Sequence, residues 1–480
     1  MDNALNLTRE GYIVGKPTSF GRSISLRIII IALLVLVLLI PISMVTGLIH
    51  ERQQRSREVT AEVTAKWADT QQIGGIVLTL PYQKHWKDSD GKEQTSVSYV
   101  QLLPESLNIK GSLNPFERQR GIYKVILYVA EISYSGAFNL ENLSKCGVPL
   151  GDMIWSDAFV SIGITDMRGI NEAMLLNWNG NSYQLEPGVR QGCDLFDTGV
   201  SVPIAIEPAA AEQSVTPINF SFALDLNGSE AISFLPLGQI TTAEMSSEWA
   251  SPSFEGAFLP QTRSIDSNGF IASWKILDFN RNYPQQWVGN IGGAKLDEVR
   301  EYDFGVMLFS PIDQYSQSLR ALKYAILFVG LTFLIFFTVE VFNRRRIHPV
   351  QYLLVGLALC LFYVLLLSLS EHIAFAAAYV IAALACLVLI TVYVGSALQS
   401  KVAALATAAT LAGLYAFMYV LLSNEDYALL IGSVGLFVIM VAVMLLTRKV
   451  DWYRIELRQE SAADAESSEP WDEQWDQLQE

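Results

Sequence analysis

The sequence predicts a membrane protein with six transmembrane α-helices, one near the N-terminus and five near the C-terminus. A large, mainly antiparallel β domain is predicted between the first and the second helix. Three observations support this fold class. Of the 480 residues, 51% are hydrophobic and only 17% are charged. Six apolar segments reach the roughly 20 residues that a helix needs to cross ~30 Å of hydrocarbon. Residues 50–320, between the first two segments, contain no apolar run of that length.

The first apolar segment, residues 27–49, is predicted to be an uncleaved anchor that follows an N-terminal arm, residues 1–26. Its apolar core is long for a signal peptide, and no clear small-x-small cleavage site follows it. Cleavage remains the alternative. Residues 50–73 are predicted to continue outward as a helical stalk, because Val59, Val63 and Trp67 recur every four residues.

Residues 74–320 show the pattern of a β domain. Short runs such as SVSYVQLLP and INFSFALDL alternate or are rich in β-branched residues. Tight hairpins are predicted at Asn179-Gly180, Asn227-Gly228 and Asn268-Gly269, because glycine tolerates positive φ. We interpret the domain as two stacked β subdomains whose boundary the sequence does not place.

The charge balance limits the classes of partner that the chain can bind. The net charge is −15, which excludes nucleic acid, because a phosphate backbone selects basic patches. Residues 50–320 contain 32 acidic and 20 basic residues. This domain therefore repels anionic lipid headgroups and favours a cationic or neutral partner, unless the acids only confer solubility.

Cys146 and Cys193 are the only cysteines of residues 50–320. An oxidising compartment permits a disulfide between them, and closing a loop of this length is worth ~4 kcal/mol in the chain-entropy model. Sequence alone does not show whether their Cα atoms approach closely enough. The bonded and the free forms therefore both remain open.

Residues 321–447 are predicted to form a five-helix transmembrane bundle, followed by an acidic tail, residues 448–480. The predicted spans are 322–342, 349–369, 373–394, 402–422 and 428–446. Two of these helices carry small residues every four positions, which allows close helix packing. The two stripes are Ala374, Ala378, Ala382 and Cys386, and Ala404, Ala408, Ala412 and Ala416.

The loop charges orient the bundle. Cations occur in alternate junctions, at Arg344 to Arg346, at Lys401, and at Arg448 and Lys449, whereas the loops SLSEH and SNEDY have none. Cationic short loops stay cytoplasmic. Both termini are therefore predicted in the cytoplasm and the β domain on the outer side of the membrane, which is the periplasm if the membrane is a bacterial inner membrane.

Two polar positions of the bundle are candidate sites. Glu340 lies four residues before Arg344, a spacing that favours a helical ion pair. An acid within a span otherwise suggests function. The loop residues Ser368, Ser370, Glu371 and His372 form either a polar corner or a site that couples the bundle to the β domain. If this loop is only a polar corner, Glu371 is expected to cap the start of the following helix.

No motif for catalysis or for a cofactor was found. GxxxxGK[ST], HExxH, GxSxG and CxxC are all absent from the sequence. The prediction is therefore a protein without enzymatic activity, cofactor or metal.

Several blocks resemble the CreD family of bacterial inner-membrane proteins. These blocks include GLIHERQQRSREV, QRGIYKVILY and GFIASWKILDFNRNYPQQW, and the most specific one is RRRIHPVQYLLVGLALCLFYVLLLSLSEHIAFAAAY. The resemblance implies a role in cell-envelope integrity and envelope stress, with expression under a CreBC-type two-component system. Because no catalytic residues are established for the family, the resemblance assigns none to this sequence.

The sequence and the resemblance together predict a function by binding. The β domain would contact an unknown envelope protein or a cell-wall component, while the bundle contacts the lipid bilayer. The first alternative is a transporter or flippase that uses the bundle and involves Glu340, Gln351 or Glu371. The second is an envelope enzyme, which would require acids that converge in one cleft of the β domain. The oligomeric state is not specified.

Overall fold

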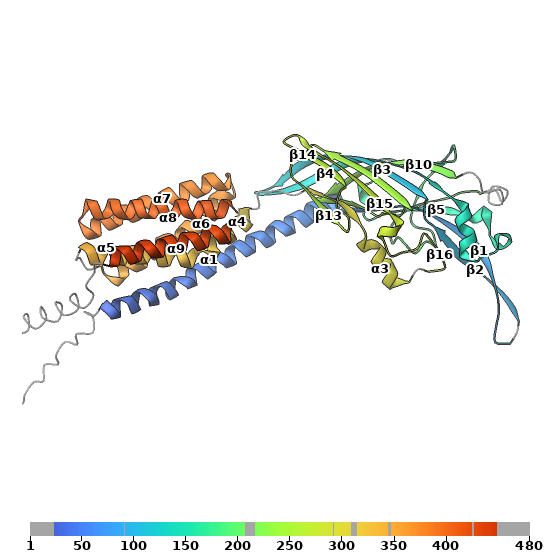
Figure 1. Ribbon diagram of the computed structural model, residues 1–480. Coiled ribbons are helices and arrows are strands. Elements are labelled where there is room, and N and C mark those ends of the chain that lie inside the picture. The colour runs from blue at the N-terminus through green and yellow to red at the C-terminus, as the bar shows by residue number, and fades with distance from the viewer. Residues whose placement is uncertain are drawn as a thin grey trace, which may run out of the picture. The chain divides into compact units, whose positions relative to one another are not determined.

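The computed structural model describes the chain in seven stretches: residues 24–90, 92–206, 217–290, 292–308, 314–343, 347–424 and 427–448. These residues fall into two compact units (Figure 1). The first combines the N-terminal residues up to Gln53 with the residues from Asp313 onward, and the second spans Gln54–Ile312. A β-rich unit is thus inserted into a helical one, as the sequence predicts.

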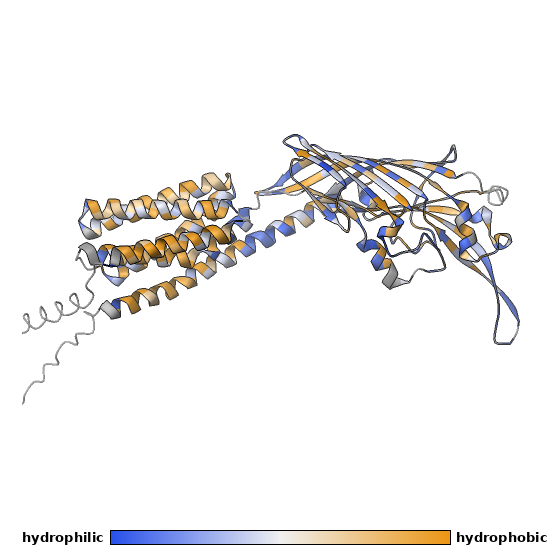
Figure 2. Ribbon diagram, in the orientation of Figure 1, coloured by the Kyte–Doolittle hydropathy of each residue, from blue (hydrophilic) through white to orange (hydrophobic). Residues whose placement is uncertain are grey.

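The helical unit contains the predicted membrane spans. Among the described residues, five helices are long and apolar enough to cross a membrane, and α4 with α5 makes a sixth if this pair, bent by 47°, is one span. Figure 2 shows that apolar residues dominate the N-terminal half of α1 and the helices α5 to α9. The helices are α1 (Ile24–Trp67), α4 (Gln314–Lys323), α5 (Ala325–Asn343), α6 (Pro349–Ser370), α7 (Phe375–Leu398), α8 (Lys401–Ser423) and α9 (Ala428–Thr447).

Local signals determine where several of these helices start. His348 caps α6 by accepting a hydrogen bond from the backbone N–H of Val350, and Gln351 completes a capping box. Pro349 occupies the first position of α6, where its missing N–H costs nothing. Ser400 caps α8 by accepting from the N–H of Ala403 at 3.3 Å.

The bundle packs around aromatic rings and only one of the two predicted small-residue stripes. Ala378, Ala382 and Cys386 of α7 are buried, and the thiol of Cys386 contacts the carbonyl oxygen of Ala358 in α6 at 3.5 Å. Ala374, at the end of this stripe, is exposed. The stripe predicted on α8 is wrong as a packing face, because its members are half-buried or exposed. The buried face of α8 instead carries Ala403, Thr407, Leu411, Leu414, Tyr415 and Met418.

The inserted unit is built from two sheets. The nine-stranded sheet has the order β13-β17-β11-β1-β5-β9-β8, with β2 paired to β1 and β16 paired to β2. Its strands are β1 (Gln71–Lys87), β2 (Glu93–Leu102), β5 (Phe159–Ile164), β8 (Glu186–Pro187), β9 (Gly199–Pro203), β11 (Ala231–Phe234), β13 (Pro252–Gly256), β16 (Gln286–Val288) and β17 (Phe304–Leu308).

The eight-stranded sheet has the order β14-β15-β12-β3-β4-β10-β6-β7. Only β1 with β11 and β3 with β12 pair in parallel; the other described pairs are antiparallel. The strands are β3 (Ser106–Arg120), β4 (Tyr123–Phe138), β6 (Leu175–Trp178), β7 (Asn181–Gln184), β10 (Ile218–Ser229), β12 (Ile240–Ser247), β14 (Thr262–Asp266) and β15 (Gly269–Leu277).

Both sheets contribute to one hydrophobic core, so the prediction of two stacked subdomains is wrong. In β10, Phe220, Phe222 and Leu224 point inward between exposed residues, as period-two alternation requires. They join Ile76 and Leu78 of β1 in the same cluster of buried residues. The remaining helical elements cover edges and ends of the sheets: η2 (Leu140–Cys146), η3 (Leu150–Asp152), η4 (Trp155–Asp157), η5 (Met167–Gly169), η6 (Asp278–Asn280) and α3 (Gly293–Glu301).

Two of the three predicted hairpin turns occur in the structure. Asn179 and Gly180 have φ values of 48° and 89° and link β6 to β7. The hairpin of β14 and β15 closes between Asp266 and Gly269. Asn227-Gly228 is not a turn but part of β10, paired with β4. A Cβ atom at Gly228 would lie 2.2 Å from the hydroxyl oxygen of Tyr128, so glycine is needed there for packing.

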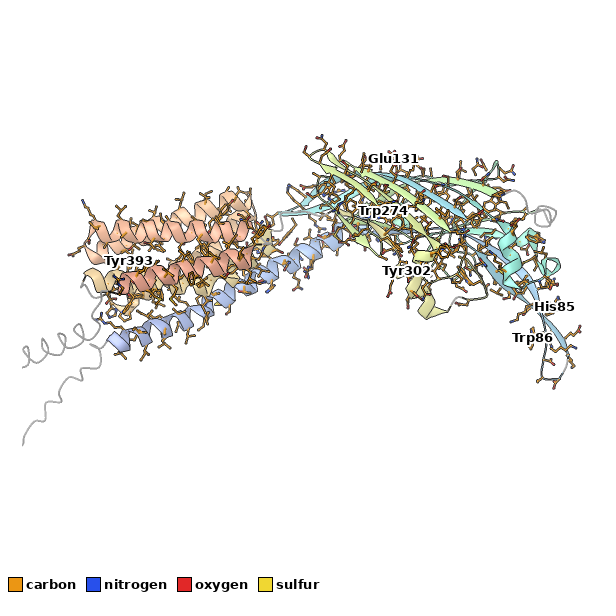
Figure 3. All side chains as sticks on the ribbon, in the orientation of Figure 1. His85, Trp86, Glu131, Trp274, Tyr302 and Tyr393 are labelled. Atoms are coloured by element: carbon orange, nitrogen blue, oxygen red, sulfur yellow. The ribbon has the colours of Figure 1, made fainter. Side chains whose placement is uncertain are left out.

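One β hairpin extends beyond the rest of its unit. The strands β1 and β2 pair from Leu78 with Leu102 to Lys87 with Glu93. The inner half of this ribbon is largely buried, whereas residues 83–87 and 93–97 are all exposed. We call these two segments the arm. Figure 3 shows His85 and Trp86 on it, away from the body of the two sheets.

Candidate functional site

The predicted polar corner between α6 and α7 is contacted by two other helices. The carboxylate of Glu371 accepts a hydrogen bond from the hydroxyl of Tyr315 in α4 at 3.4 Å and lies 3.8 Å from Nε of Arg52 in α1. The Glu371 side chain is only 9% exposed. Contact with α1 and α4 therefore turns this corner into a connection between helices that are distant in sequence.

The remaining corner residues bond to backbone atoms near them. The hydroxyl of buried Ser370 donates to the carbonyl of Leu367 at 2.9 Å. Nδ1 of His372 lies 3.1 Å from the carbonyl oxygen of Ser368, and both residues are exposed.

The expected capping role of Glu371 is wrong. Glu371 follows the last residue of α6, whereas α7 begins at Phe375 with Ala374 at its N-cap. A carboxylate at the C-terminus of a helix meets the negative end of the helix dipole, which is unfavourable. The nearby guanidinium of Arg52 offsets this charge.

Glu340 is the second polar centre, at the other end of the helical unit. Its side chain is buried, and its carboxylate accepts from the guanidinium of Arg27 in α1. It also accepts from the backbone N–H of Ile347 at 3.2 Å and from the hydroxyl of Tyr352 in α6 at 2.9 Å. The predicted partner Arg344 lies outside the described residues. Three donors from three segments therefore satisfy this acid.

The two acids position the N-terminal helix against the bundle. Arg27 and Arg52 are 25 positions apart in α1, which corresponds to about 37 Å at 1.5 Å per residue. The hydrocarbon core is ~30 Å thick, so the two ion pairs fall near its two boundaries. Between them, Leu38 is fully buried against α6, where Gly356 leaves the space that a Cβ would fill.

The last turns of α1 are fixed to the inserted unit. The guanidinium of Arg168 donates to the carbonyl oxygen of Ala65, where a cation is favourable because the C-terminus of a helix is negative. Glu62 forms a 2.5 Å ion pair with Arg120 at the end of β3. The ring of Trp67 contacts that of Phe116, also in β3, with centroids 5.5 Å apart.

Asp166 organises this junction. Its carboxylate accepts from Nη2 of Arg168 at 2.6 Å and from the backbone N–H of Asp69 at 3.0 Å. These hydrogen bonds stabilise the charged form, and they lower the pKa of Asp166 to about 2 against the cost of burial. The carboxylate therefore stays ionised well below neutral pH and holds the segment after α1.

Cys146 and Cys193 are both free, so the disulfide considered from the sequence is not formed in the structure. Cys146 ends η2, which packs beside β2 and β16, whereas Cys193 lies in the loop between β8 and β9. Burial raises the pKa of Cys193 to about 11. This thiol is therefore a poor nucleophile at neutral pH.

The open face of the eight-stranded sheet contains an acidic groove. Glu131 of β4 and Asp225 of β10 are directly opposite each other, and Figure 3 labels Glu131. The groove has a volume of about 680 Å³. Its charged lining residues are Glu131, Glu172, Asp225, Glu244 and Lys110. Among the described residues, no group of three or more His, Cys, Asp or Glu side chains is arranged to hold a metal ion.

Sequence reasoning missed Arg27, Arg52 and Tyr352 as partners of the two acids. A signal for Arg27 was present, because it directly precedes the first span and Glu340 ends the second. Opposite charges at the same end of neighbouring spans predict a pair. Tyr352 carries no comparable signal, since its hydroxyl reaches Glu340 only through the packing of α6 on α5.

Comparison with known proteins agrees with the fold. A family model described as inner membrane protein CreD matches residues 23–453. The inner membrane protein CreD of Escherichia coli (strain K12) is 33% identical over 427 residues. This alignment covers 88% of the chain and 92% of the E. coli protein.

Proposed function

The chain belongs to the CreD family of inner membrane proteins, and from this premise we propose that it supports cell-envelope integrity and the envelope stress response. It acts by binding rather than catalysis, as a scaffold whose expression is controlled by a two-component system. The β unit binds an envelope protein or a cell-wall component, and the helices hold it in the inner membrane.

The proposed orientation rests on the charges at the helix ends. Lys401 begins α8 and Arg448 follows α9, whereas α1 does not decide the orientation, because cations lie both before its apolar part (Arg27) and after it (Arg52 and Arg55). The α6–α7 corner contains no Lys or Arg. Since cationic junctions stay cytoplasmic, both termini face the cytoplasm. The Glu340 cluster is then cytoplasmic, the Glu371 cluster is periplasmic, and the β unit lies in the periplasm.

Accessible tags test this orientation. A tag inserted at Asn179-Gly180 should be labelled by an impermeant reagent in intact spheroplasts, because this turn is exposed in the β unit. A tag at Ser400 should be labelled only after lysis. The reverse pattern would overturn the proposed topology, whatever the function.

The observation that carries the binding role is the attachment of α1. This helix pairs with the bundle through Glu340 and Glu371, and its last turns are held by Arg168 and Arg120. A partner bound to the β unit is therefore linked to the helices by contacts along α1. The Glu371 pair is the coupling site expected at the corner.

A deletion strain tests the function. We expect envelope lesions that wild-type protein repairs, and that Glu371→Ala repairs less well at the same protein level because its contact to Arg52 is lost. Glu58→Ala, which breaks the exposed Arg55–Glu58 pair, is the matched control and should complement fully. A deletion strain with an intact envelope under stress would refute the proposal.

Transport is the second candidate, and one observation favours it. A groove of about 240 Å³ opens between α7 and α8, beside the buried rings of Tyr379 and Tyr415, but its other lining residues are mostly apolar and it contains none of the three polar residues expected on a transport path. A transporter would lose substrate movement in vesicles when a polar residue of its path is replaced by alanine. Glu340, Gln351 and Glu371 are the residues to test. Gln351 also caps α6, so its loss requires a folding control.

If the chain were an enzyme, its active site would lie in the acidic groove of the β unit, where the acids converge. Glu131→Gln and Asp225→Asn remove charge without changing shape, so a binding scaffold for neutral ligands should tolerate both. Loss of complementation in both variants, at unchanged protein level, would show that the function depends on this groove, and catalysis there would then require a product that the wild type forms and both variants do not.

A further inference from the structure

In the arm, a two-stranded ribbon is exposed on both faces. Its five cross-strand pairs run from Gln83 with Val97 to Lys87 with Glu93. A ribbon of two strands is only marginally stable in water when no other element covers it. Its tip is closed by Asp88, which accepts bonds from the backbone N–H groups of Asp90 and Lys92. The arm is thus ordered by local bonds rather than by a core.

An aromatic ring lies on this uncovered ribbon. The side chain of Trp86 is 49% exposed. Cross-strand register places Gln94 opposite Trp86 and Ser96 opposite Lys84, so these four residues share one face. Trp86 is therefore surrounded by hydrogen-bonding side chains. Lys84 is the charged arm residue of this face, and the carboxylate of Asp88 at the tip accepts a hydrogen bond from Gln94 Nε2 at 3.1 Å.

The surroundings of Trp86 argue against a protein strand as the occupant. Within the described part of the chain, no further strand pairs with the edges of the arm, because β5 pairs with β1 only as far as Thr79 and β16 pairs with β2 only from Val100 to Leu102. Lysines on an edge strand discourage the addition of another strand, and Lys84 and Lys87 are exposed there.

The same face has the chemistry of a site for an anionic glycan. An indole ring offers a flat apolar surface to the C–H face of a sugar ring, and its polar neighbours can bond to hydroxyl and amide groups. Gln94 and Ser96 supply donors and acceptors, and Lys84 supplies a cation for a carboxylate. Because residues 50–320 are acidic overall, an anionic polymer is repelled less by residues 83–97, where three lysines balance three acids, than by the rest of the unit.

We propose that the arm binds peptidoglycan, the glycan of the cell wall whose strands carry carboxylates on their peptides. Trp86 stacks on a sugar ring, Gln94 and Ser96 bond to its polar groups, and Lys84 pairs with a carboxylate. This inference rests on the proposed periplasmic binding role and names the partner class of the β unit.

Co-sedimentation of the full chain in detergent with purified peptidoglycan sacculi tests the inference. We expect wild-type protein to pellet with sacculi and Trp86→Ala to bind about tenfold more weakly. Trp86→Phe should keep most of the binding, because a ring remains. Lys84→Ala should weaken binding at low salt, with a smaller effect at high salt. Phe279→Ala is the matched control, because Phe279 is 91% exposed in η6 and should leave binding unchanged.

Three outcomes would overturn the inference. The first is a wild-type chain that does not pellet with sacculi, and the second is a Trp86→Ala variant that pellets like wild type. The third is equal retention by lipopolysaccharide micelles or by an envelope protein cross-linked through the arm. None of these affects the complementation result, so the failure of this inference is distinguishable from failure of the proposed function.

Discussion

Replacing Arg168 by alanine tests whether α1 is firmly attached to the β unit. The variant loses the bond to the carbonyl oxygen of Ala65 and the charge partner of Asp166. Asp166 has its pKa lowered from an ordinary value near 3.8 to about 2, which corresponds to ~2.5 kcal/mol. Part of this shift comes from the backbone N–H groups of residues 69 and 168, which the variant keeps, and the Arg168 side chain is 56% exposed, so the expected loss is about 1–1.5 kcal/mol.

Urea unfolding of the full chain in detergent, followed by tryptophan fluorescence, measures this loss. Arg190→Ala is the matched control, because its 3.7 Å pair with Glu186 joins two exposed side chains. The control should change the unfolding free energy by less than ~0.5 kcal/mol. Hydrogen exchange over residues 61–67 should accelerate in Arg168→Ala only.

The sign of the pH effect follows from the lowered pKa. A carboxylate with a depressed folded-state pKa stabilises the protein above its unfolded pKa, and this stabilisation is lost as the pH falls through the folded pKa. The difference between wild type and Arg168→Ala should therefore be full at pH 7 and shrink between pH 4 and pH 2. The reasoning is refuted if Arg168→Ala loses no more than Arg190→Ala, or if the difference persists unchanged at pH 2.

Three further predictions concern burial. Glu340→Ala should lower the free energy of unfolding of the helices in detergent, measured by thermal unfolding, by ~3–5 kcal/mol, because Arg27 loses its charge partner. A loss below ~1 kcal/mol would contradict the buried pair. Gly228→Ala should cost ~1–3 kcal/mol in urea unfolding through a clash with a tyrosine hydroxyl, whereas Gly151→Ala, with nothing within 4 Å, should be nearly neutral. Half-buried Cys146 should be alkylated before buried Cys193. The alkylation rate of Cys193 should rise with pH up to about pH 11, because the thiolate is the reactive form. Equal alkylation rates for the two cysteines would show that the core around Cys193 is accessible to the reagent.

The sequence by itself determined the membrane spans, the position of the insert and its β character. These are properties of short stretches: an apolar run of sufficient length must avoid water, and alternation must place every second residue on one face. The Asn179-Gly180 turn is local in the same sense. The bend between α4 and α5 has no such signal, and the span predicted over residues 322–342 includes only the last two residues of α4.

Only the tertiary structure decided which residues meet. Glu340 is 313 positions from Arg27, and no local pattern relates them. Gly228 looked like a turn residue because its neighbours permit one, but the packing of Tyr128 places it in a strand. Alternation in a strand predicts which side chains point into a core, but it does not predict which sheet they pack against. That both sheets share one core is therefore seen only in the tertiary structure. Contacts that depend on the path of the whole chain are set by packing, which no single segment encodes.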